Sequence, residues 1–597
     1  MSARDERGAL TPSAALYDYA RQRTRESADG LPPSRGYALP RKAAPGGEPL
    51  SWDAAKPALR EALTPLPDDP VTLLRRFERL GVRDRHQHLV APVVAGLPLP
   101  DERADAARAL GRRLIREGTT AATVIAGIAL LGRVGGPEDV PYLRVLGLLQ
   151  GLTGPAVGAL EALDPRTAAV VWLAVHARRD GLEPLVRALW AGDRPAVRRE
   201  LVSAPSPVGG DVARRIAEAT RLADLLDHSR DTDLLARAGT LLVRMGSSPD
   251  GPADLLGYRD APRAYATVVG RAAQLPPTLD HAAMLLSLAL DLGSGTGVLL
   301  DWPPGRRAAL LASLGALLAE PRWVAAGAGA DGRRADWIRR TGRRPFRPRP
   351  AAFRIEVVAG DPADKAPVET RVLIDGRPVV PAAFARGPAA QPDDLLDGGG
   401  LRAGPEPREV RLATASCAEG CCGALYVTIR RDGDQVVWEN WRQTMPGSRG
   451  AVPELPAHRF DARAYDAEVA RAEGDCSWSW RARTVARLIK AGLIGRPDLL
   501  SRWDASRGWI SSDFDDPDTA VVTFSYAPGP PAPGRPERDG IPLQFRWDIP
   551  DDGSPPEAQA AAALRRLAEE DPKSYGRVCG GSRERAEELG YPWPYGG

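Results

Sequence analysis

The chain has 597 residues, of which 43% are hydrophobic and 26% charged, so it is long enough for several domains and is not expected to be disordered as a whole. Lys and Arg number 80 against 77 Asp and Glu, and the net charge of only +3 argues against strong attraction to nucleic acid or anionic membranes. Only five of the basic residues are Lys, and we interpret the excess of Arg, with abundant Ala, Gly and Pro, as the codon usage of a GC-rich bacterial genome.

The sequence carries no signal that would direct it to a membrane or out of the cell. Residues 1–12 are charged and are not followed by an apolar stretch, so they do not resemble a secretory signal. The longest apolar stretches, such as residues 121–131, are shorter than the ~20 residues that span a bilayer. Five Cys cannot form a disulfide framework. We therefore expect a cytoplasmic protein with reduced thiols and no membrane partner.

Helices are predicted throughout residues 61–335, after an irregular segment, residues 1–60, that contains some helix. Asp69-Pro70 and Asp164-Pro165 each place a capping carboxylate before a proline at the first helical position. Apolar residues recur at helical spacing after each of these starts, and no alternating pattern typical of strands interrupts the region.

Part of this helical region is repetitive. Two similar segments, TAATVIAGIALLG from Thr120 and TAAVVWLAVHA from Thr167, begin 47 residues apart, and each is followed by a helix led by proline. With residues 130–146 and 192–201, these segments resemble the repeats of HEAT and armadillo proteins. The resemblance covers residues 120–201 and implies an extended array that binds a partner through its surface. A helical bundle without repeats is the alternative.

A glycine-rich segment, LDLGSGTGVLLDW at residues 290–302, resembles the cofactor loop of S-adenosylmethionine-dependent methyltransferases. Such a loop needs a strand before it and an acid at the end of the next strand. Residues 280–290 instead have the pattern of an amphipathic helix, and no strand ending in an acid follows. We therefore predict that Gly293 to Gly297 form a turn between two helices and bind no S-adenosylmethionine.

Residues 333–349 contain eight Arg and one acid, Asp336, and prolines at 345, 348 and 350 then break any helix. We interpret residues 336–351 as a solvated linker between an α-helical repeat array, residues 61–335, and a C-terminal α+β domain, residues 352–597. A phosphate- or RNA-binding strip over Arg333 to Arg349 is the alternative.

From Phe353 onward the hydrophobic period changes to two, which is typical of strands. Asp375-Gly376 and Asp432-Gly433 are signals for tight hairpins. Further strands are predicted at residues 519–526 and 543–548, and helices at 480–491 and 556–570. The predicted fold is therefore multidomain, with an all-α, HEAT-like N-terminal half and an α+β domain with antiparallel hairpins.

Trp438 and Trp441 lie in the second strand of the Asp432-Gly433 hairpin. They are three residues apart, so in a regular strand they point to opposite faces. We expect Trp438 to lie in the core, because the end of the strand after it is more polar.

The order of several motifs across residues 352–572 resembles an uncharacterised domain of GC-rich soil bacteria. The motifs are IDGRPVV, EVRLATASCAEGCCGALYVTI, VVWENW, HRFDARAYDAEV, LLSRWDASRGWISSDFDDPD and LQFRWDIP. The resemblance implies a domain boundary and no activity. Where that family has Cys-Ser-Cys-Gly-Glu, this chain has Ala415-Ser416-Cys417-Ala418-Glu419, so the first cysteine of the motif is missing.

A zinc site is one interpretation of the cysteines in and around this motif. Cys417 and Cys421 have the spacing of one ligand pair, and Cys422, Cys476 or His458 would have to complete the site. Because a second closely spaced pair is absent from the sequence, a structural turn before a strand is favoured.

Two other groups of polar residues are interpreted as structural. Asp513, Asp515, Asp516 and Asp518 lack the glycine and the glutamate that a calcium loop needs, which favours an acidic turn. His86 and His88 are interpreted as a chance pair in a helix. No nucleophile elbow, P-loop or His-Glu-x-x-His motif occurs in the sequence.

We therefore expect a non-catalytic scaffold that binds another protein through its helical array and needs no cofactor. The first alternative is an enzyme with a site near Cys417 and the Trp438/Trp441 strand. The second, which is less favoured, is nucleic-acid binding through the helical array and the arginine-rich strip.

Overall fold

The computed structural model of the chain describes residues 14–27, 31–40, 51–67, 69–80, 86–176, 181–205, 208–247, 252–328, 332–343, 346, 351–364, 368–384, 387–415, 423–444, 455–513, 516–527 and 542–594. It contains two compact units. Unit 1 consists of residues 1–248 and 254–275, and unit 2 consists of residues 249–253 and 276–597.

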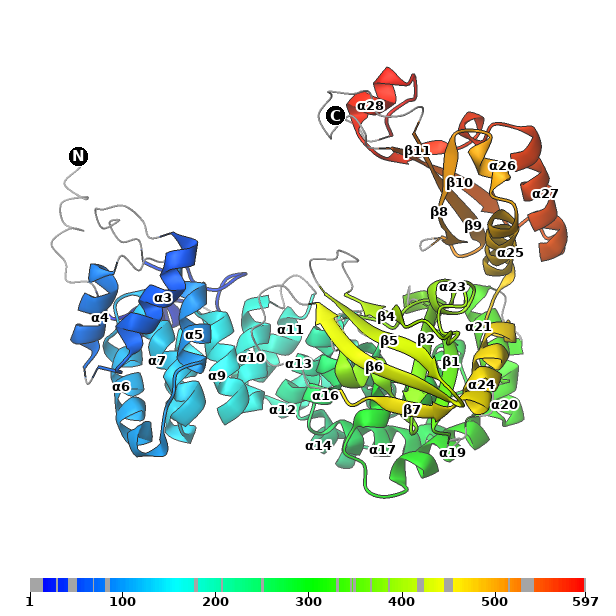
Figure 1. Cartoon of the computed structure of the whole chain (residues 1–597). Coiled ribbons are helices and arrows are strands. Elements are labelled where there is room, and N and C mark those ends of the chain that lie inside the picture. The colour runs from blue at the N-terminus through cyan, green and yellow to red at the C-terminus, as the bar shows by residue number, and fades with distance from the viewer. Residues whose placement is uncertain are drawn as a thin grey trace. The chain divides into compact units, whose positions relative to one another are not determined.

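Unit 1 is built from helices, with one isolated β-bridge between Tyr37 and Leu149 (Figure 1). The helices are α2 (Leu16–Glu26), α3 (Trp52–Leu63), α4 (Pro70–Arg79), α5 (Gln87–Ala95), η2 (Asp101–Arg103), α6 (Ala104–Glu117), α7 (Ala121–Val134), η3 (Pro137–Asp139), α8 (Val140–Leu146), α9 (Thr153–Leu163), α10 (Pro165–His176), α11 (Glu183–Ala191), α12 (Arg194–Ser203), α13 (Gly210–Thr220), α14 (Leu222–Asp227), α15 (Thr232–Gly246), α16 (Ala253–Gly257), α17 (Ala261–Arg271) and η5 (Ala272–Gln274).

The predicted helix starts are confirmed at two prolines. The backbone N–H of Thr72 donates to the Asp69 carboxylate at 3.0 Å, and α4 begins at Pro70. The N–H of Thr167 donates to Asp164 at 3.2 Å, and α10 begins at Pro165. Each carboxylate satisfies an amide that has no partner within its helix, which fixes where the helix begins.

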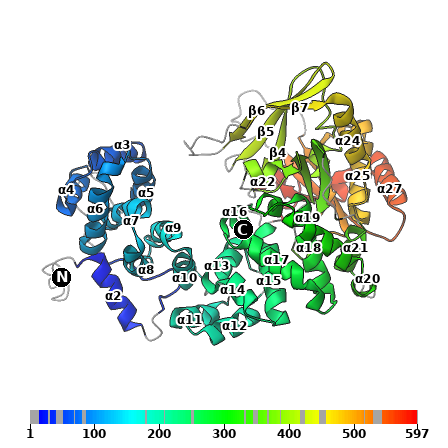
Figure 2. The ribbon, with the colours of Figure 1, turned by 90° about the horizontal axis from the view of Figure 1, so that it is seen from below.

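Successive helices of unit 1 pack in an unbroken row. Helix α7 packs on α9, α9 on α10, α10 on α13, α13 on α15, and α15 on α17 (Figure 2). The proline-led helices α8 and α11 follow α7 and α10, as the sequence predicts. The helical character of this half is thus confirmed, whereas a regular HEAT-like repeat stays a prediction.

In its described residues, unit 2 combines helices with three antiparallel sheets. Its elements are α18 (Leu279–Ser294), η6 (Thr296–Leu299), α19 (Arg306–Leu318), α20 (Pro321–Ala328), α21 (Arg333–Thr341), β1 (Phe353–Ala359), η7 (Pro362–Asp364), β2 (Val368–Ile374), β3 (Arg377–Pro378), α22 (Val379–Ala383), α23 (Pro392–Leu395), β4 (Arg408–Thr414), β5 (Ala424–Asp432), β6 (Gln435–Thr444), β7 (His458–Asp461), α24 (Ala462–Gly474), α25 (Arg481–Gly495), α26 (Asp498–Ser501), β8 (Ala505–Ser512), β9 (Thr519–Tyr526), β10 (Leu543–Pro550), α27 (Pro556–Glu569), η9 (Pro572–Ser574), β11 (Arg577–Gly580) and α28 (Arg583–Glu588).

The strand orders in the three sheets are β1-β2-β3, β4-β5-β6-β7 and β11-β10-β9-β8. Both predicted hairpins are present. Asp375 and Gly376 join β2 to β3 with φ values of 49° and 73°, and Gly433, in the turn between β5 and β6, has φ 62°. Glycine adopts these left-handed angles without steric cost, which is why the Asp-Gly signal is reliable.

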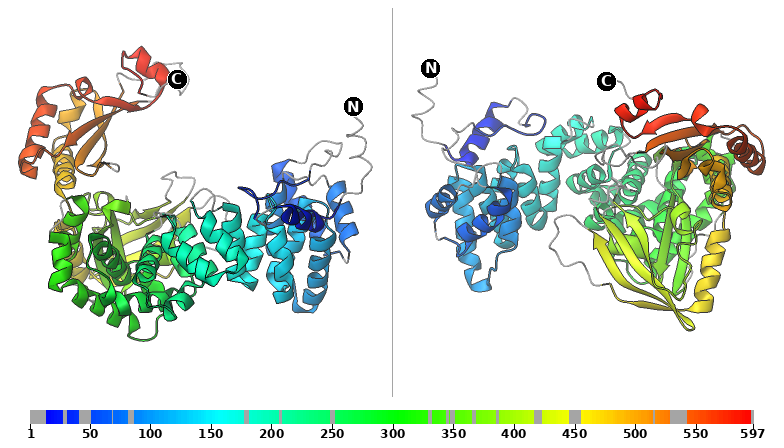
Figure 3. Two further views of the ribbon diagram at one scale, coloured as in Figure 1. Left: turned by 180° about the vertical axis from the view of Figure 1, so that it is seen from behind. Right: turned by 45° about the horizontal axis from the view of Figure 1, so that its top comes forward.

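Each of the two larger sheets has its own core. Helices α25 and α27 supply apolar residues to the core of the β8–β11 sheet, where the rings of Phe524 and Phe545 stack at 5.3 Å. Helix α24 packs beside β1, β6 and β7 (Figure 3, right, where α24, β6 and β7 are yellow). Its Tyr465 contacts Phe353, with a centroid distance of 4.5 Å. The predicted α+β character of this half is confirmed.

The division between the units differs from the predicted linker at residues 336–351. Residues 333–341 form helix α21, and its buried Trp337 donates its indole N–H to the carbonyl of Ala359 in β1 at 2.9 Å. Arg334 of the same helix binds Asp361 at 2.7 Å. Helices α18 to α21 therefore belong with the sheets of unit 2, and the change of hydrophobic period marks the first strand rather than the start of the unit.

Among the described residues, no single helix is long and apolar enough to span a membrane. Helix α19 and residues 321–327 reach such a length and composition only together, and they are bent by 70°.

Candidate functional site

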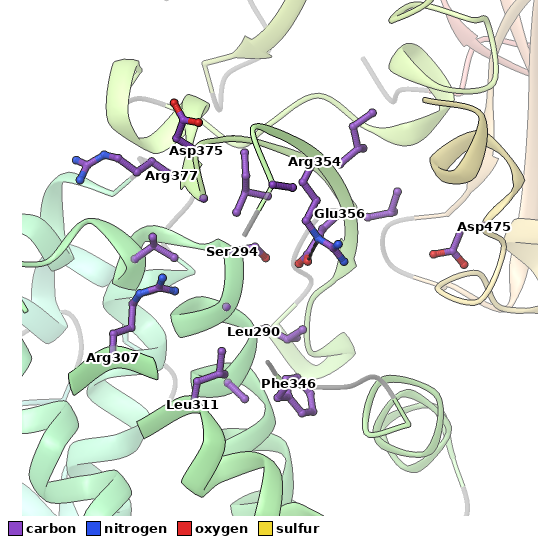
Figure 4. Close-up of a pocket in the computed structure, with 18 of the residues that line it drawn as sticks. Leu290, Ser294, Arg307, Leu311, Phe346, Arg354, Glu356, Asp375, Arg377 and Asp475 are labelled. Carbon is purple, nitrogen blue, oxygen red and sulfur yellow. Dashed lines mark hydrogen bonds and ion pairs between the residues drawn. The ribbon is translucent and has the colours of Figure 1, made fainter. Parts of the chain in front are cut away.

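Unit 2 contains a cavity of about 920 Å³ between helices α18 and α19 and strands β1 to β3 (Figure 4). It is lined by Ala289, Leu290, Gly293, Ser294, Val298, Arg307, Leu311, Phe346, Ala351, Ala352, Arg354, Ile355, Glu356, Val357, Leu373, Asp375, Gly376, Arg377, Arg471, Asp475 and Ser477. We call this space the α18–α19 cavity. Its volume lies within the range of about 300–1,000 Å³ that is typical of small-molecule sites.

The glycine-rich segment forms one wall of this cavity. Helix α18 ends at Ser294, and the carboxylate of Asp291 accepts the backbone N–H of Gly297 at 3.0 Å. A Cβ atom on Gly295 would lie 2.4 Å from Asp291 Oδ1, so only glycine allows the turn to close this tightly. The segment joins two helices and a helix rather than a strand precedes it, as predicted. However, the turn is shorter than the predicted Gly293 to Gly297, because Gly293 belongs to α18 and Gly297 to η6, which leaves only Gly295 between them. The absence of S-adenosylmethionine binding stays a prediction.

Arg307 lies in the first turn of α19 and lines the cavity. Its Nη1 donates to the carbonyl oxygen of Leu292 at 2.8 Å, which anchors the side chain against the end of α18. Burial lowers the pKa of the Arg307 guanidinium. Among the described residues no carboxylate forms an ion pair with Arg307, so its positive charge is not compensated there.

The other arginines of the cavity are either paired with an acid or exposed to solvent. Arg354 donates to Glu356 at 2.8 Å, and Arg471 binds Glu468 at 2.7 Å. Arg377, in the short strand β3, is exposed. The charges near β1 and α24 are therefore paired, whereas the α19 side carries an uncompensated cation.

Apolar residues continue the α19 wall beyond Arg307. Leu311 lies four residues further along, on the same face of the helix, and is buried. Phe346 approaches α19 one turn later, where a Cβ on Gly315 would lie 3.4 Å from its Cβ. In Figure 4, Leu290 borders the same part of the cavity. The wall thus changes from cationic to apolar along one helix face.

The candidate zinc ligands are not brought together among the described residues. Cys417, Cys421 and Cys422 lie outside the described residues. Cys476 is exposed, and its Sγ accepts Arg487 Nη1 at 3.2 Å, while His458 pairs with Trp438 at the start of β7. No group of three metal-ligating side chains occurs in the part of the chain that the structure describes. The zinc hypothesis therefore stays untested.

For the two tryptophans of β6, the predicted burial of Trp438 is confirmed, but the predicted opposite orientation of Trp438 and Trp441 is wrong. Trp438 is fully buried, as predicted. However, its ring lies 5.9 Å from that of Trp441, so the two do not point to opposite faces. Tyr426 pairs with Arg442 but Thr428 pairs with Glu439, so β6 has one extra residue here, and Asn440 takes φ 52°. This β-bulge resets the alternation between the two tryptophans.

Four described arginines of the strip, Arg333, Arg334, Arg339 and Arg340, are bound to other residues of unit 2. Arg333 donates to Asp518 at 2.6 Å and also binds Asp516. Asp513 binds Arg546 instead. The acidic cluster is therefore a partner of arginines in the fold, and Asp515 and the arginines at 344, 347 and 349 lie outside the described residues.

The two adjacent histidines of unit 1 do not converge on one site. His86 is fully buried just before α5, whereas His88, two residues later, is exposed. This geometry agrees with their interpretation as a chance pair.

Sequence reasoning missed the residues that build the α18–α19 cavity. Arg307 is one of many arginines, and Arg354 and Phe346 belong to no motif. Two sequence signals lie at the cavity, the glycine-rich segment and the Asp375-Gly376 hairpin, but neither indicated a binding site. No known protein family, no curated protein and no solved structure matches the chain.

Proposed function

We propose that the chain is a non-catalytic recognition protein whose unit 2 binds a small organic ligand in the α18–α19 cavity. The observation that carries this proposal is the cavity itself, about 920 Å³ in volume and lined by both arginines and apolar side chains. Such mixed lining gives a ligand apolar contact area together with a few polar groups that orient it.

The polar groups of the cavity favour binding over catalysis. All six histidines lie among the described residues, and none lines the cavity. Of its carboxylates, Glu356 accepts Arg354, and Asp475 lies 3.9 Å from Arg471. Because no histidine lines the cavity, Ser294 and Ser477 have no imidazole beside them to act as a general base. The rival hypothesis, an enzyme with a site near Cys417, loses support at Trp438, which is a core residue.

A second candidate function, docking of a partner protein on unit 1, is favoured by the unbroken row of helices from α7 to α17. Stacked helices offer an extended surface that needs no catalytic residues. This proposal retains the cytoplasmic scaffold expected from the sequence. Nucleic-acid binding is less favoured, because Arg333 and Arg334 bind acidic residues of unit 2.

Ligand binding is tested by blocking the cavity in the full chain. Leu311→Trp places a large side chain in the cavity, and Ala309→Trp is the matched control, because Ala309 is exposed on the same helix. Thermal melts are recorded with a panel of organic acids, alcohols and amines. We expect at least one compound to raise the melting temperature of the wild type and of Ala309→Trp but not of Leu311→Trp. Equal shifts in both variants would place binding elsewhere.

Partner docking is tested by affinity purification of the tagged full chain, followed by cross-linking mass spectrometry. Because the chain has only five Lys but 77 acidic residues, a carboxylate-reactive cross-linker is required. We expect a captured protein to be linked to acids of unit 1. Links confined to unit 2 would contradict the docking proposal and leave the ligand proposal intact.

A further inference from the structure

We propose that the ligand of the α18–α19 cavity is an anionic amphiphile. Its carboxylate or phosphate group would bind Arg307, and its apolar body would lie along α19 past Leu311 toward Phe346. This inference rests on the proposed ligand-binding function and specifies the chemistry of that site.

The anionic group is inferred from the environment of Arg307. A guanidinium that loses water without gaining a counter-charge is costly, and natural proteins rarely leave such a group unpaired. Within the described part of the chain, Arg307 forms one hydrogen bond, from Nη1 to the Leu292 carbonyl oxygen at 2.8 Å. A guanidinium offers five N–H donors, so several remain for an oxyanion in the cavity. An oxyanion would form charge-assisted hydrogen bonds with them.

The remaining charges of the cavity do not favour a cationic ligand. Glu356 is bound by Arg354 at 2.8 Å, and Asp475 lies beside Arg471. Asp375 lies in the β2–β3 turn and is exposed to solvent. Glu356 and Asp475 are thus paired with arginines and Asp375 is solvent-exposed, whereas Arg307 has no carboxylate partner among the described residues.

The apolar body is inferred from the positions that follow Arg307 on α19. Leu311 is one turn away on the same face, and Gly315, another turn on, is where Phe346 approaches the helix. A rise of 1.5 Å per residue separates Arg307 from Gly315 by about 12 Å along the helix. This length matches an alkyl chain of about ten carbons or an aromatic body of similar extent.

Calorimetry on the full chain tests the inference with four probes of equal chain length, namely decanoate, decyl phosphate, decanol and decyltrimethylammonium, each below its micellar concentration. We expect the two anions to bind, and the alcohol and the cation to bind about tenfold more weakly or not at all. Arg307→Gln should weaken both anions by about tenfold or more. The matched control is Arg306→Gln, because Arg306 is the exposed neighbour outside the cavity, and it should leave affinity unchanged.

The two anions separate the possible sources of the headgroup. A larger loss for decyl phosphate than for decanoate on Arg307→Gln would indicate a phosphate ligand, and the reverse would indicate a carboxylate. If Arg307→Gln fails to fold, Arg307→Lys retains the charge but not the planar fork, and it should weaken anion binding severalfold. Anion affinity of the wild type should also fall with rising salt.

The outcomes distinguish this inference from the function on which it rests. Equal affinity for decanol and decanoate, with loss of both in Leu311→Trp, would overturn the anionic ligand but leave a ligand-binding cavity. Binding of no probe, together with a panel in which no compound stabilises the wild type, would overturn both proposals.

Discussion

Asp139 in unit 1 is a buried carboxylate held by two neighbours. Arg112 Nε donates to Oδ1 at 2.7 Å, and the backbone N–H of Gly136 donates to Oδ2 at 2.9 Å. Burial alone would raise the pKa of Asp139, but these hydrogen bonds outweigh it and hold the pKa below its usual value. Asp139→Asn should therefore lower the free energy of unfolding by about 2–3 kcal/mol at neutral pH.

The pH dependence of this loss has a defined sign. Because the folded pKa is depressed, the stabilisation is complete above the ordinary aspartate pKa of about 4 and is lost as pH falls through the folded pKa. Urea unfolding at pH 7, 5 and 3.5 should thus show a difference between wild type and Asp139→Asn that narrows only at the lowest pH. Glu138→Gln, which removes the exposed partner of Arg112, should have a smaller effect. A difference that grows on acidification would contradict this reasoning.

Trp438 should contribute far more to stability than Trp441. Trp438 is fully buried and packs against Phe353 and Tyr465, whereas Trp441 is partly exposed. We expect Trp438→Ala to cost about 3–5 kcal/mol, as for a large aromatic removed from a core. Trp441→Ala should cost about 1 kcal/mol, because its side chain is only partly buried. Denaturant melts of the two full-length variants provide the measurement, and a larger loss for Trp441→Ala would refute the assignment.

Residues were predictable from the sequence where their role depends on near neighbours. Asp69 and Asp164 cap helices through amides three residues away, so a short pattern predicts them. Arg307 gains its role from a cavity whose other wall is formed by Arg354 and Glu356, nearly fifty residues later. No local spacing records that juxtaposition, and an arginine-rich composition conceals it further.

At the scale of elements, the bulge in β6 depends on one backbone conformation. Asn440 has φ 52°, a left-handed angle that Asn and Gly tolerate and β-branched residues avoid. Because Asn440 is exposed, a substitution there changes the backbone preference with little change in packing. Asn440→Val should cost about 1–2 kcal/mol, whereas Asn440→Gly should be nearly neutral. Equal free energies of unfolding for Asn440→Val and Asn440→Gly in urea melts would contradict the claim that this left-handed position disfavours a β-branched residue.

The turn after α18 allows a similar test with two glycines of one motif. A Cβ on Gly295 would meet the Asp291 carboxylate at 2.4 Å and the Asp291 Cα at 2.9 Å, so Gly295→Ala should cost about 1–3 kcal/mol. Gly293 lies inside α18 with no atom within 4 Å of its Cβ position, and Gly293→Ala should be neutral or stabilising by up to about 1 kcal/mol. Thermal melts compare the two variants, and calorimetry should detect no binding of S-adenosylmethionine. Micromolar affinity for that cofactor would contradict the interpretation of a structural turn.

Helices and hairpins were predictable where the local sequence preference and the packing in the fold favour the same structure. The two Asp-Gly hairpins and the helix starts at Pro70 and Pro165 formed as expected. The β-bulge was not predictable, because Asn440 is compatible with a regular strand end and only the pairing with β5 reveals the extra residue. That pairing depends on contacts across the sheet, which the local sequence does not encode.

For the whole molecule, the boundary between the units depends on which surface each helix covers. Helix α18 has an ordinary helical pattern, so the sequence groups it with the helices before it, whereas most of α21 lies in the predicted linker. Their partners are nevertheless in unit 2, because Arg371 of β2 donates to the Leu290 carbonyl and Trp337 donates to the Ala359 carbonyl. A hydrophobic period indicates the type of an element but not the identity of its neighbour.

The boundary gives a final prediction about which fragments fold. Residues 276–597 retain the helices that cover β1 to β3, and they should melt cooperatively as an isolated fragment. Residues 350–597 lack α18, α19 and α21, which leaves the apolar face of β1 and the acid Asp361 without their helical partners. This shorter fragment should melt at a lower temperature or aggregate, because it exposes apolar surface that the longer one buries. Calorimetry and circular dichroism of both fragments, with residues 1–275 as a helical reference, provide the test. A fragment 350–597 as stable as 276–597 would return the boundary to the arginine-rich segment.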